Sequence, residues 1–338
     1  MNYEGAKRFK GSAVGDFALY RETAHSYPRL LSDTEKLGFR QKPFDWSKGH
    51  PNFLGNMYQL LNGIDAMKLE PGATIVEVGS GAGWATEVLA SLKYKVICIE
   101  PSDIMLETAK RRVTDFLRSH EMPELIGSVK YICNTFEEEN LEENSADAVL
   151  FFESFHHIID EEVAVAQIRN VLKPDGVLCI LGDSNWIPGF REQEEFWEDE
   201  MRRYGTLESP FTHEYLIALL EHYQFYSVSR YHGVNAMIPV DQEEEPVGKF
   251  AGNLDARYVN LFTARNGKDR NFPERTISAP AQMPASPPTE IPSAPTTDAS
   301  LENSSVVLSL ATKIKMLSPK FAQPLFSRIW HDYIRKAR

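Results

Sequence analysis

The chain has 338 residues, of which 42% are hydrophobic, and it carries a formal net charge of −12. This length allows one large core with appendages, and the negative charge argues against a general affinity for the phosphate backbone of nucleic acids. No run of eighteen apolar residues occurs, so we expect a cytoplasmic protein without a membrane-spanning helix. The cysteines and the acidic runs show no metal-ligand spacing, so the sequence predicts no metal site.

A glycine-rich turn is the first strong pattern in chain order. A helix expected over 54–67 leads to the β-branched strand Thr74–Val78, and glycines then occupy every second position until a helix begins near Trp84. Glycines let the backbone approach a ligand where a Cβ would collide, and the following helix N-terminus favours negative charge. The pattern predicts a nucleotide-binding turn made of Glu77, Gly79, Ser80, Gly81 and Gly83.

The glycine spacing separates two kinds of nucleotide. A dinucleotide fingerprint would place its third glycine at position 84, where this chain has Trp84, so NAD is disfavoured. Glu100 ends the next expected strand, Lys95–Ile99, and stands twenty-one residues after Gly79. A carboxylate at this position can accept hydrogen bonds from both ribose hydroxyls of either ligand, so an NAD(P)-dependent oxidoreductase remains an alternative.

The rest of the body alternates helices and strands. Such alternation predicts a Rossmann-like, doubly wound α/β fold, in which helices cover both faces of a mostly parallel sheet and ligands bind beyond the carboxyl ends of its strands. A turn is expected at Pro174–Gly176. The expected helices are 84–92, 102–120, 160–172, 190–204 and 212–222, and the further strands are 129–133, 146–152, 177–181, 226–231 and 258–263.

Four segments match the motifs of one family in the order that the family requires. They are EVGSGAG (77–83), KVICIEPSDIML (95–106), SADAVLFFESFHHI (145–158) and LKPDGVLCILGD (172–183). Over residues 53–265 the chain resembles the class I S-adenosylmethionine-dependent methyltransferases, most closely their small-molecule, type-11-like branch. The resemblance implies S-adenosylmethionine as cofactor, a small-molecule acceptor such as a sugar or natural-product hydroxyl, and one antiparallel strand near the C-terminal end of the domain.

Ligands bind beyond the strand ends, so the residues that follow the first three strands, together with Glu77 and Glu153, are predicted to hold the cofactor. After the third strand the family commonly has an aspartate that meets the adenine amino group, whereas this chain has Asn134. An amide oxygen accepts the same hydrogen bond, and the neighbouring Thr135 remains an alternative. The predicted cofactor residues are Glu77, Gly79, Ser80, Gly81, Gly83, Glu100, Pro101, Asn134, Thr135 and Glu153.

Two histidines follow the fourth strand and would face the acceptor. His156 and His157 titrate in a range that suits a general base for an acceptor hydroxyl, and Asp183, after the fifth strand, is a second candidate. In-line methyl transfer depends mainly on positioning, so a base is optional and the histidines would also suit a capping or packing role. A non-catalytic module that binds the cofactor or a partner remains a further alternative.

The sequence divides into four regions. Residues 1–53 are rich in aromatic side chains and form either a lid over the substrate or a segment that packs on the methyltransferase domain, 54–266. Residues 267–300 have the proline-rich composition of a disordered linker. The tail 301–338 carries seven lysines and arginines against two acids. Its amphipathic helix, 324–338, would dock on the acidic body, or on a membrane surface or protein partner.

Overall fold

The computed structural model describes residues 1, 3–10, 20, 23–44, 50–232 and 260–268. The chain divides into two units, Met1–Pro273 and Glu274–Arg338, and the second unit lies wholly outside the described residues. The predicted basic tail, and the predicted linker from residue 269 onward, therefore lie outside them as well. Within the described ranges, no helix combines the length and the hydropathy needed to cross a membrane.

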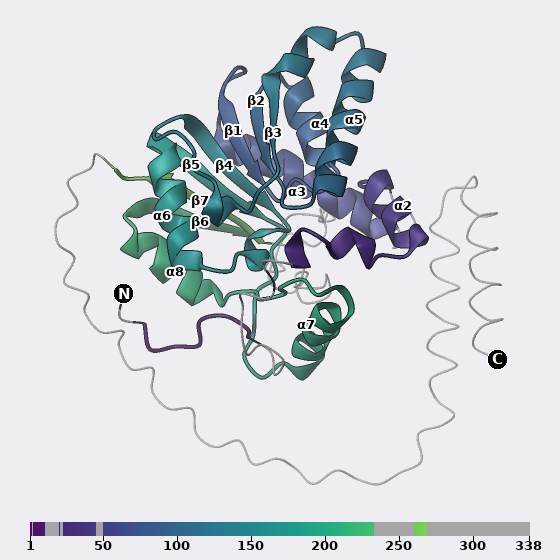
Figure 1. The fold of residues 1–338 in the computed structure, drawn as a ribbon. Helices are drawn as coiled ribbons and strands as arrows, with labels where there is room; N and C mark the ends of the chain where they lie inside the picture. Colours follow the sequence, from purple (N-terminus) through teal and green to yellow (C-terminus); the bar gives the residue numbers. More distant parts are fainter. Residues whose placement is uncertain (2, 11–19, 21–22, 45–49, 233–259, 269–338) are drawn as a thin grey trace, which may run out of the picture. The chain divides into compact units, whose positions relative to one another are not determined.

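A seven-stranded sheet organises the first unit (Figure 1). Its order is β3-β2-β1-β4-β5-β7-β6, in which β3, β2, β1, β4 and β5 pair in parallel while β7 runs antiparallel to both β5 and β6. The predicted Rossmann-like sheet with one antiparallel strand near its C-terminal end is confirmed. The strands are β1 (Thr74–Val78), β2 (Lys95–Ile99), β3 (Val129–Ile132), β4 (Ala146–Phe152), β5 (Leu172–Leu181), β6 (Phe225–His232) and β7 (Asn260–Asn266).

Helices cover both faces of the sheet. Alternate residues of β1 point to opposite sides, so that Ile75 packs against α3, α4 and α5, whereas Val76 packs against α6 and α8. The α-helices are α2 (Asp33–Gln41), α3 (His50–Met67), α4 (Trp84–Ser91), α5 (Asp103–Ser119), α6 (Glu161–Val171), α7 (Arg191–Tyr204) and α8 (His213–His222), and the short 3-10 helices are η1 (Tyr27–Arg29), η2 (Pro123–Ser128), η3 (Phe136–Glu138) and η4 (Phe155–His157).

Side-chain caps fix where four helices begin, and Ser32 caps α2. The hydroxyl of Ser102 accepts from the N–H of Met105 at the start of α5, and Asp160 and Thr212 cap α6 and α8 in the same way. Each such cap stabilises its helix by about 1 kcal/mol. The caps matter for the site because α5 and α6 begin directly after the strand ends that carry the candidate functional residues.

The predicted turn at Pro174–Gly176 lies inside a strand. β5 begins at Leu172, directly after α6, and pairs with Ala146 of β4 before a bulge shifts the register. Asp175 has a φ of 60° within this irregularity, so the chain bends there but keeps its place beside β4. The strand is therefore longer at its start than expected, while its carboxyl end at Leu181 is where the sequence places it.

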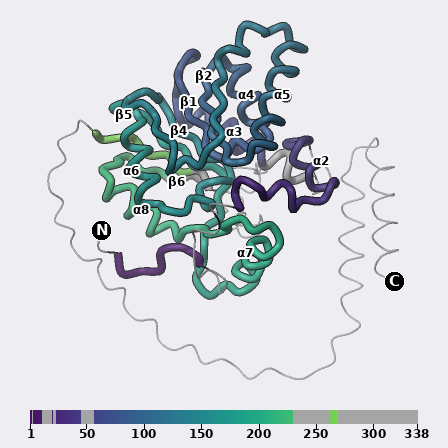
Figure 2. The backbone as a smooth tube through the Cα atoms, in the orientation of Figure 1, coloured from purple at the N-terminus to yellow at the C-terminus, as the bar shows by residue number. Residues whose placement is uncertain are grey.

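The first ten residues join the body far along the chain (Figure 2). The backbone N–H of Phe9 donates to the carbonyl of Pro210 at 2.9 Å, and Arg8 forms an isolated bridge with Phe211. Phe9 packs with Trp197 and Met201 of α7. The N-terminus therefore becomes part of the region between α7 and α8.

Candidate functional site

The three glycines of the turn have different neighbours, although all three have positive φ angles. A Cβ on Gly79 would lie 2.6 Å from Cβ of Ser154, and one on Gly83 would lie 2.6 Å from Cβ of Ala109. A Cβ on Gly81 (φ 52°) would meet nothing within 4 Å. Gly79 and Gly83 are thus required for packing, whereas Gly81 borders open space in which a ligand can approach the backbone.

Glu100 lies directly after β2 and ties the turn to the start of α5. Its carboxylate accepts from the backbone N–H of Gly81 at 2.9 Å and from that of Ser102 at 3.0 Å. Burial raises the pKa of Glu100 to about 7, although these two backbone hydrogen bonds act in the opposite direction. Each carboxylate oxygen keeps a lone pair, so the group can still accept hydrogen bonds from ribose hydroxyls beside Gly81.

Glu77 lies beneath the turn instead of in its opening. It is 2% exposed, and its carboxylate accepts from the hydroxyl of Thr86 in α4 at 2.7 Å. Burial, together with the nearby charge of Glu100, raises its pKa to about 7 despite the bond from Thr86. The structure therefore shows Glu77 supporting the first turn of α4, and direct contact with a cofactor stays a prediction.

Two buried hydroxyls, one in the glycine turn and one after β3, make no hydrogen bond to an oxygen or nitrogen atom of the described residues. They are Oγ of Ser80, which faces the thiol of Cys98, and Oγ1 of Thr135. Asn134 is already engaged, since its amide oxygen accepts from the N–H of Thr135 at 2.9 Å and its nitrogen donates to Glu139 at 3.1 Å. Buried polar groups are normally satisfied, so the open Gly81 and the two hydroxyls fit a polar ligand such as S-adenosylmethionine.

Residues of the N-terminal region pack over the turn. Leu31 joins Ala82 and Met105 in a small apolar cluster, against which Tyr27 and Phe39 also pack. The carbonyl of Pro101 accepts from Nδ1 of His25 at 2.6 Å, and Glu153, at the end of β4, forms an ion pair with Lys42.

Tyr27 lies close enough to both Glu100 and Glu208 to feel the charges of these carboxylates. Burial and the charges of Glu100 and Glu208 raise its pKa. These contacts place η1 and α2 against the ends of β1, β2 and β4, where the predicted lid would lie.

The two candidate catalytic histidines have different environments. Asp183 pairs with Nδ1 of His156, and Oε2 of Glu208 lies 3.3 Å from its Nε2. Burial opposes the charged form of His156, but the two carboxylates prevail and raise its pKa to about 10. Burial and the charge of His156 lower the pKa of His157, whose Nδ1 lies 2.5 Å from the carbonyl oxygen of Leu207. With no ligand bound, His156 is thus the protonated ring and His157 the neutral one at pH 7.

Glu208 was not identified from the sequence. It lies in the loop between α7 and α8, fifty-one residues beyond His157, and contacts both histidine rings. One nitrogen of each ring and one carboxylate oxygen of Glu208 lie within 4.8 Å of one another. A lone glutamate in a loop has no local pattern that would link it to a distant His-His pair.

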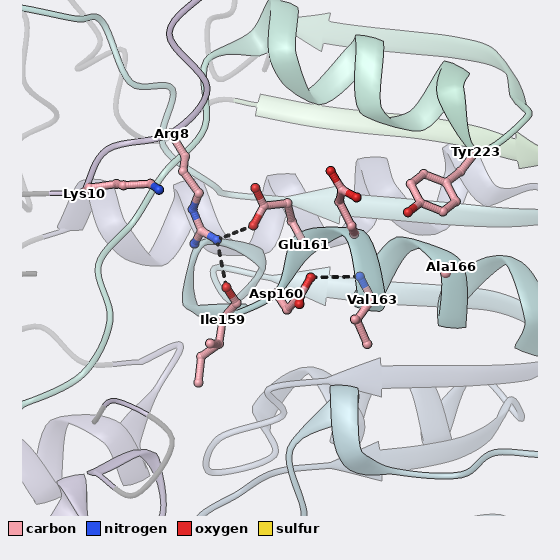
Figure 3. Close-up of a pocket in the computed structure, with 9 residues that line it drawn as sticks. Arg8, Lys10, Ile159, Asp160, Glu161, Val163, Ala166 and Tyr223 are labelled. Carbon is pink, nitrogen blue, oxygen red and sulfur yellow. Dashed lines mark hydrogen bonds and ion pairs between the residues drawn. The ribbon is translucent and has the colours of Figure 1, made fainter. Parts of the chain in front are cut away.

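Arg8 was not identified from the sequence either, and Figure 3 shows its guanidinium beside Glu161 and the carbonyl oxygen of Ile159. Its buried guanidinium donates to the carbonyl oxygen of Ile158 and to Oγ of Ser209, both at 2.8 Å, and pairs with Glu161 at 2.8 Å. It borders an open cavity of 570 Å³ whose wall includes Glu161 and Tyr223. Because Ile158 follows His157 and Ser209 follows Glu208, Arg8 fixes both the segment that carries the two histidines and the loop that carries Glu208.

Comparisons with known proteins support the family assignment. Residues 76–180 match the model of a methyltransferase domain. The ubiquinone biosynthesis O-methyltransferase of Bradyrhizobium diazoefficiens is 30% identical over 116 residues, which are 34% of this chain and 42% of that protein. The mitochondrial ubiquinone biosynthesis O-methyltransferase of Bos taurus is 36% identical over 114 residues, which are 32% of this chain and 28% of that protein. The chain thus covers less than half of each of these relatives.

A solved structure shares the fold. It is the complex of the Haloferax volcanii Trm112 methyltransferase activator with a putative methyltransferase, for which the TM-score is 0.51 at 14% identity, covering 72% of this chain and 98% of that one. Identity at this level shows the fold alone. The sheet order, the open glycine turn joined to Glu100 and the matched domain model agree, and the first unit carries a class I S-adenosylmethionine-dependent methyltransferase domain.

Proposed function

We propose that this protein transfers the methyl group of S-adenosylmethionine to a hydroxyl oxygen of a small-molecule acceptor. The observation that carries the proposal is the coupling of the open Gly81 to Glu100, with the cluster of His156, His157, Asp183 and Glu208 at the ends of the neighbouring strands. Ligands of such sheets bind beyond the carboxyl ends of the strands, so cofactor and acceptor would lie side by side.

The residues along this edge of the sheet would have different roles in the reaction. Glu100 would hold the ribose hydroxyls, the N–H groups around Gly81 would face the amino-acid tail of the cofactor, and Thr135 or Asn134 would meet the adenine. In-line displacement at the methyl carbon requires the acceptor oxygen to lie in contact with that carbon, on the side opposite the sulfur. The polar atoms of His157 and Glu208 would orient that oxygen, and η1 and α2 would exclude water.

Oxygen is the proposed acceptor atom for two reasons. Both relatives described above are named as O-methyltransferases. The cluster also presents imidazole and carboxylate groups, which hydrogen-bond hydroxyls well. A sugar or a natural product with a free hydroxyl fits these groups, whereas the net charge of −12 disfavours nucleic acid.

The test is label transfer into fractionated cell metabolites. Full-length protein is incubated with S-adenosylmethionine carrying an isotopic methyl label, and we expect label in one small-molecule fraction together with S-adenosylhomocysteine. Gly81→Val should abolish both cofactor binding and transfer, because the side chain fills the opening and resists the positive φ.

Gly72→Val is the matched control for this test. Gly72 also has a positive φ and open space around it, but it lies before β1 and away from the site. The Gly72→Val variant should be less stable than the wild type and should bind the cofactor with unchanged affinity. Cofactor binding without transfer to any fraction would favour a non-catalytic module, and equal affinity of Gly81→Val and wild type would contradict the placement of the cofactor.

A further inference from the structure

Three potential metal ligands from distant parts of the chain meet beside the proposed acceptor position. His156 and His157 form η4, and Glu208 comes from the loop between α7 and α8. We call these three residues the His–Glu cluster. Their ligand atoms lie within 4.8 Å of one another, although the sequence contains no metal-binding motif.

The spacing of the atoms suits a common ion. Nε2 of His156 lies 3.3 Å from Oε2 of Glu208, and Nδ1 of His157 lies 3.7 Å from Oε1. Two ligand atoms bound at about 2.0–2.1 Å in tetrahedral geometry are roughly 3.3 Å apart. Nε2 of His156 and Oε2 of Glu208 are thus already spaced as two ligands of one ion, whereas the His157 ring must change its Nδ1 contact with Leu207 to supply a third.

Neighbouring groups orient the His156 ring as they do in metal sites. Asp183 holds Nδ1 of His156, which directs Nε2 toward Glu208. The same carboxylate accepts from the backbone N–H groups of Phe155 at 3.2 Å and His156 at 3.3 Å, so it is itself fixed. Nδ1 of His157 lies 2.5 Å from the carbonyl oxygen of Leu207, so this nitrogen must leave that contact, or the ring must turn to offer Nε2, before His157 can bind an ion. A carboxylate that holds the second nitrogen of a ligating histidine is a recurrent partner of bound metal ions.

The cluster is exposed on one side only. The side chains of His156, Asp183 and Glu208 are 15%, 10% and 16% exposed, whereas that of His157 is 41% exposed. The open side of the cluster is thus the side of His157, where an acceptor can enter.

We propose that His156, His157 and Glu208 bind one divalent transition-metal ion such as Zn²⁺, with Asp183 as a positioning residue for His156 and a coordination position left for the acceptor oxygen. Binding of the ion stands on its own, whereas its use in catalysis rests on the proposed methyl transfer. Two imidazoles and a carboxylate suit Zn²⁺, Fe²⁺ or Co²⁺ better than Mg²⁺, which prefers oxygen ligands.

The role of the ion would be to activate the acceptor. A hydroxyl bound to a divalent ion loses its proton more readily, and that proton passes to solvent. The resulting oxygen forms a bond to the methyl carbon as the carbon–sulfur bond breaks. The electron pair of the broken bond stays on sulfur in S-adenosylhomocysteine. The ion keeps its oxidation state throughout.

The test uses full-length protein without a histidine tag, stripped of metal with a chelator and titrated with Co²⁺. We expect one equivalent to bind with a visible absorption spectrum typical of histidine ligation, and Zn²⁺ to displace it. Glu208→Gln and His157→Ala should each weaken Co²⁺ binding at least tenfold, and Asp183→Asn should weaken it about 10–100-fold. His120→Ala, which removes an exposed histidine at the end of α5, should bind as the wild type does.

Cofactor affinity, measured by calorimetry, reports whether each variant is folded. A wild-type protein that binds no Co²⁺ at one equivalent, or a folded Glu208→Gln that binds it as tightly as the wild type, overturns the proposal. Because the readout is metal binding, failure here leaves the proposed methyl transfer standing. Conversely, absence of methyl transfer would not remove a Co²⁺ site that the variants abolish.

Discussion

The glycine turn and Glu100, which form the proposed ribose side of the cofactor site, come from one continuous stretch of chain between Ile75 and Glu100, whereas the proposed acceptor side joins four separate segments. Gly81 and Glu100 are nineteen residues apart and share a hydrogen bond. On the acceptor side, Arg8 reaches Ser209 across 201 residues, and His156 contacts Asp183 and Glu208. The cofactor side therefore depends on local turns, whereas the acceptor side depends on the packing of the whole unit.

The largest effect on stability should come from replacing Arg8, the residue that joins the segments of the acceptor side. Arg8→Ala removes a buried cation, so that Glu161 loses its ion pair and keeps the hydrogen bond from Tyr215, and the carbonyl of Ile158 loses its donor. Losing one partner of a buried ion pair is strongly destabilising. We expect the free energy of unfolding, measured in urea, to fall by about 3 kcal/mol, and not by more, because Glu161 keeps partial access to water.

The neighbouring residue is the control. Lys7→Ala removes a cation that lies 5.5 Å from the Tyr215 ring centroid, and it should have a small effect. At a temperature where Arg8→Ala is still folded, it should keep cofactor affinity and lose transfer. A parallel loss of cofactor affinity would show that the two sides are not independent.

The same contrast between local turns and distant contacts explains which parts of the fold and the site could be predicted from the sequence. β1 to β4 and the glycine turn have β-branched runs and glycines at fixed spacing, so the sequence alone locates them. β5 was predicted to begin after Pro174–Gly176, but bulged pairing with Ala146 extends it, and such tertiary pairing has no local signature. His156 and His157 were found because they follow a strand. Arg8 and Glu208 lie outside any motif, so only the folded chain connects them to these histidines.

A second prediction concerns the buried carboxylate beneath the cofactor turn. Glu77 has a pKa of about 7 in the folded protein, above its ordinary value of 4.5. Its contribution to stability is full below pH 4.5, where both states are protonated, and is lost as the pH rises through 7. Glu77→Gln cannot ionise and keeps the hydrogen bond from Thr86. The free energy of unfolding of this variant, relative to that of the wild type, should therefore rise by about 2–3 kcal/mol from pH 4 to pH 8.

Unfolding of the cofactor-free protein, followed at several pH values, measures this difference. If the wild type and Glu77→Gln gave parallel curves from pH 4 to pH 8, the carboxyl group would titrate normally and would not lie in the buried position beneath the turn.

A third prediction addresses the ribose contact. Glu100→Ala should weaken S-adenosylmethionine binding by about 2 kcal/mol, or roughly thirtyfold, while Glu100→Gln should do less damage because an amide oxygen still accepts a hydrogen bond. Glu107→Ala, an exposed change on α5, serves as control. Unchanged affinity in Glu100→Ala would remove this residue from the cofactor site.

The pH dependence of the same binding provides an independent test. Ribose hydroxyls bind the charged carboxylate, whose pKa in the cofactor-free protein is about 7. Affinity should therefore fall by up to about tenfold for each pH unit below 7. This dependence should weaken in Glu100→Gln, and calorimetry between pH 5.5 and 8 would reveal it.

The smallest effect should decide between the two residues proposed to meet the adenine. Oγ1 of Thr135 is buried without a partner among the described residues, so Thr135→Val removes an unsatisfied group at nearly constant volume. The cofactor-free protein should gain about 0.5–1 kcal/mol of stability, whereas Thr86→Val, which removes the donor to Glu77, should lose stability. If Thr135 contacts the adenine, Thr135→Val should also weaken cofactor binding about fivefold, equivalent to one neutral hydrogen bond. A stabilised variant with unchanged affinity would assign the contact to Asn134, and a destabilised variant would show that the hydroxyl already has a partner within the folded protein.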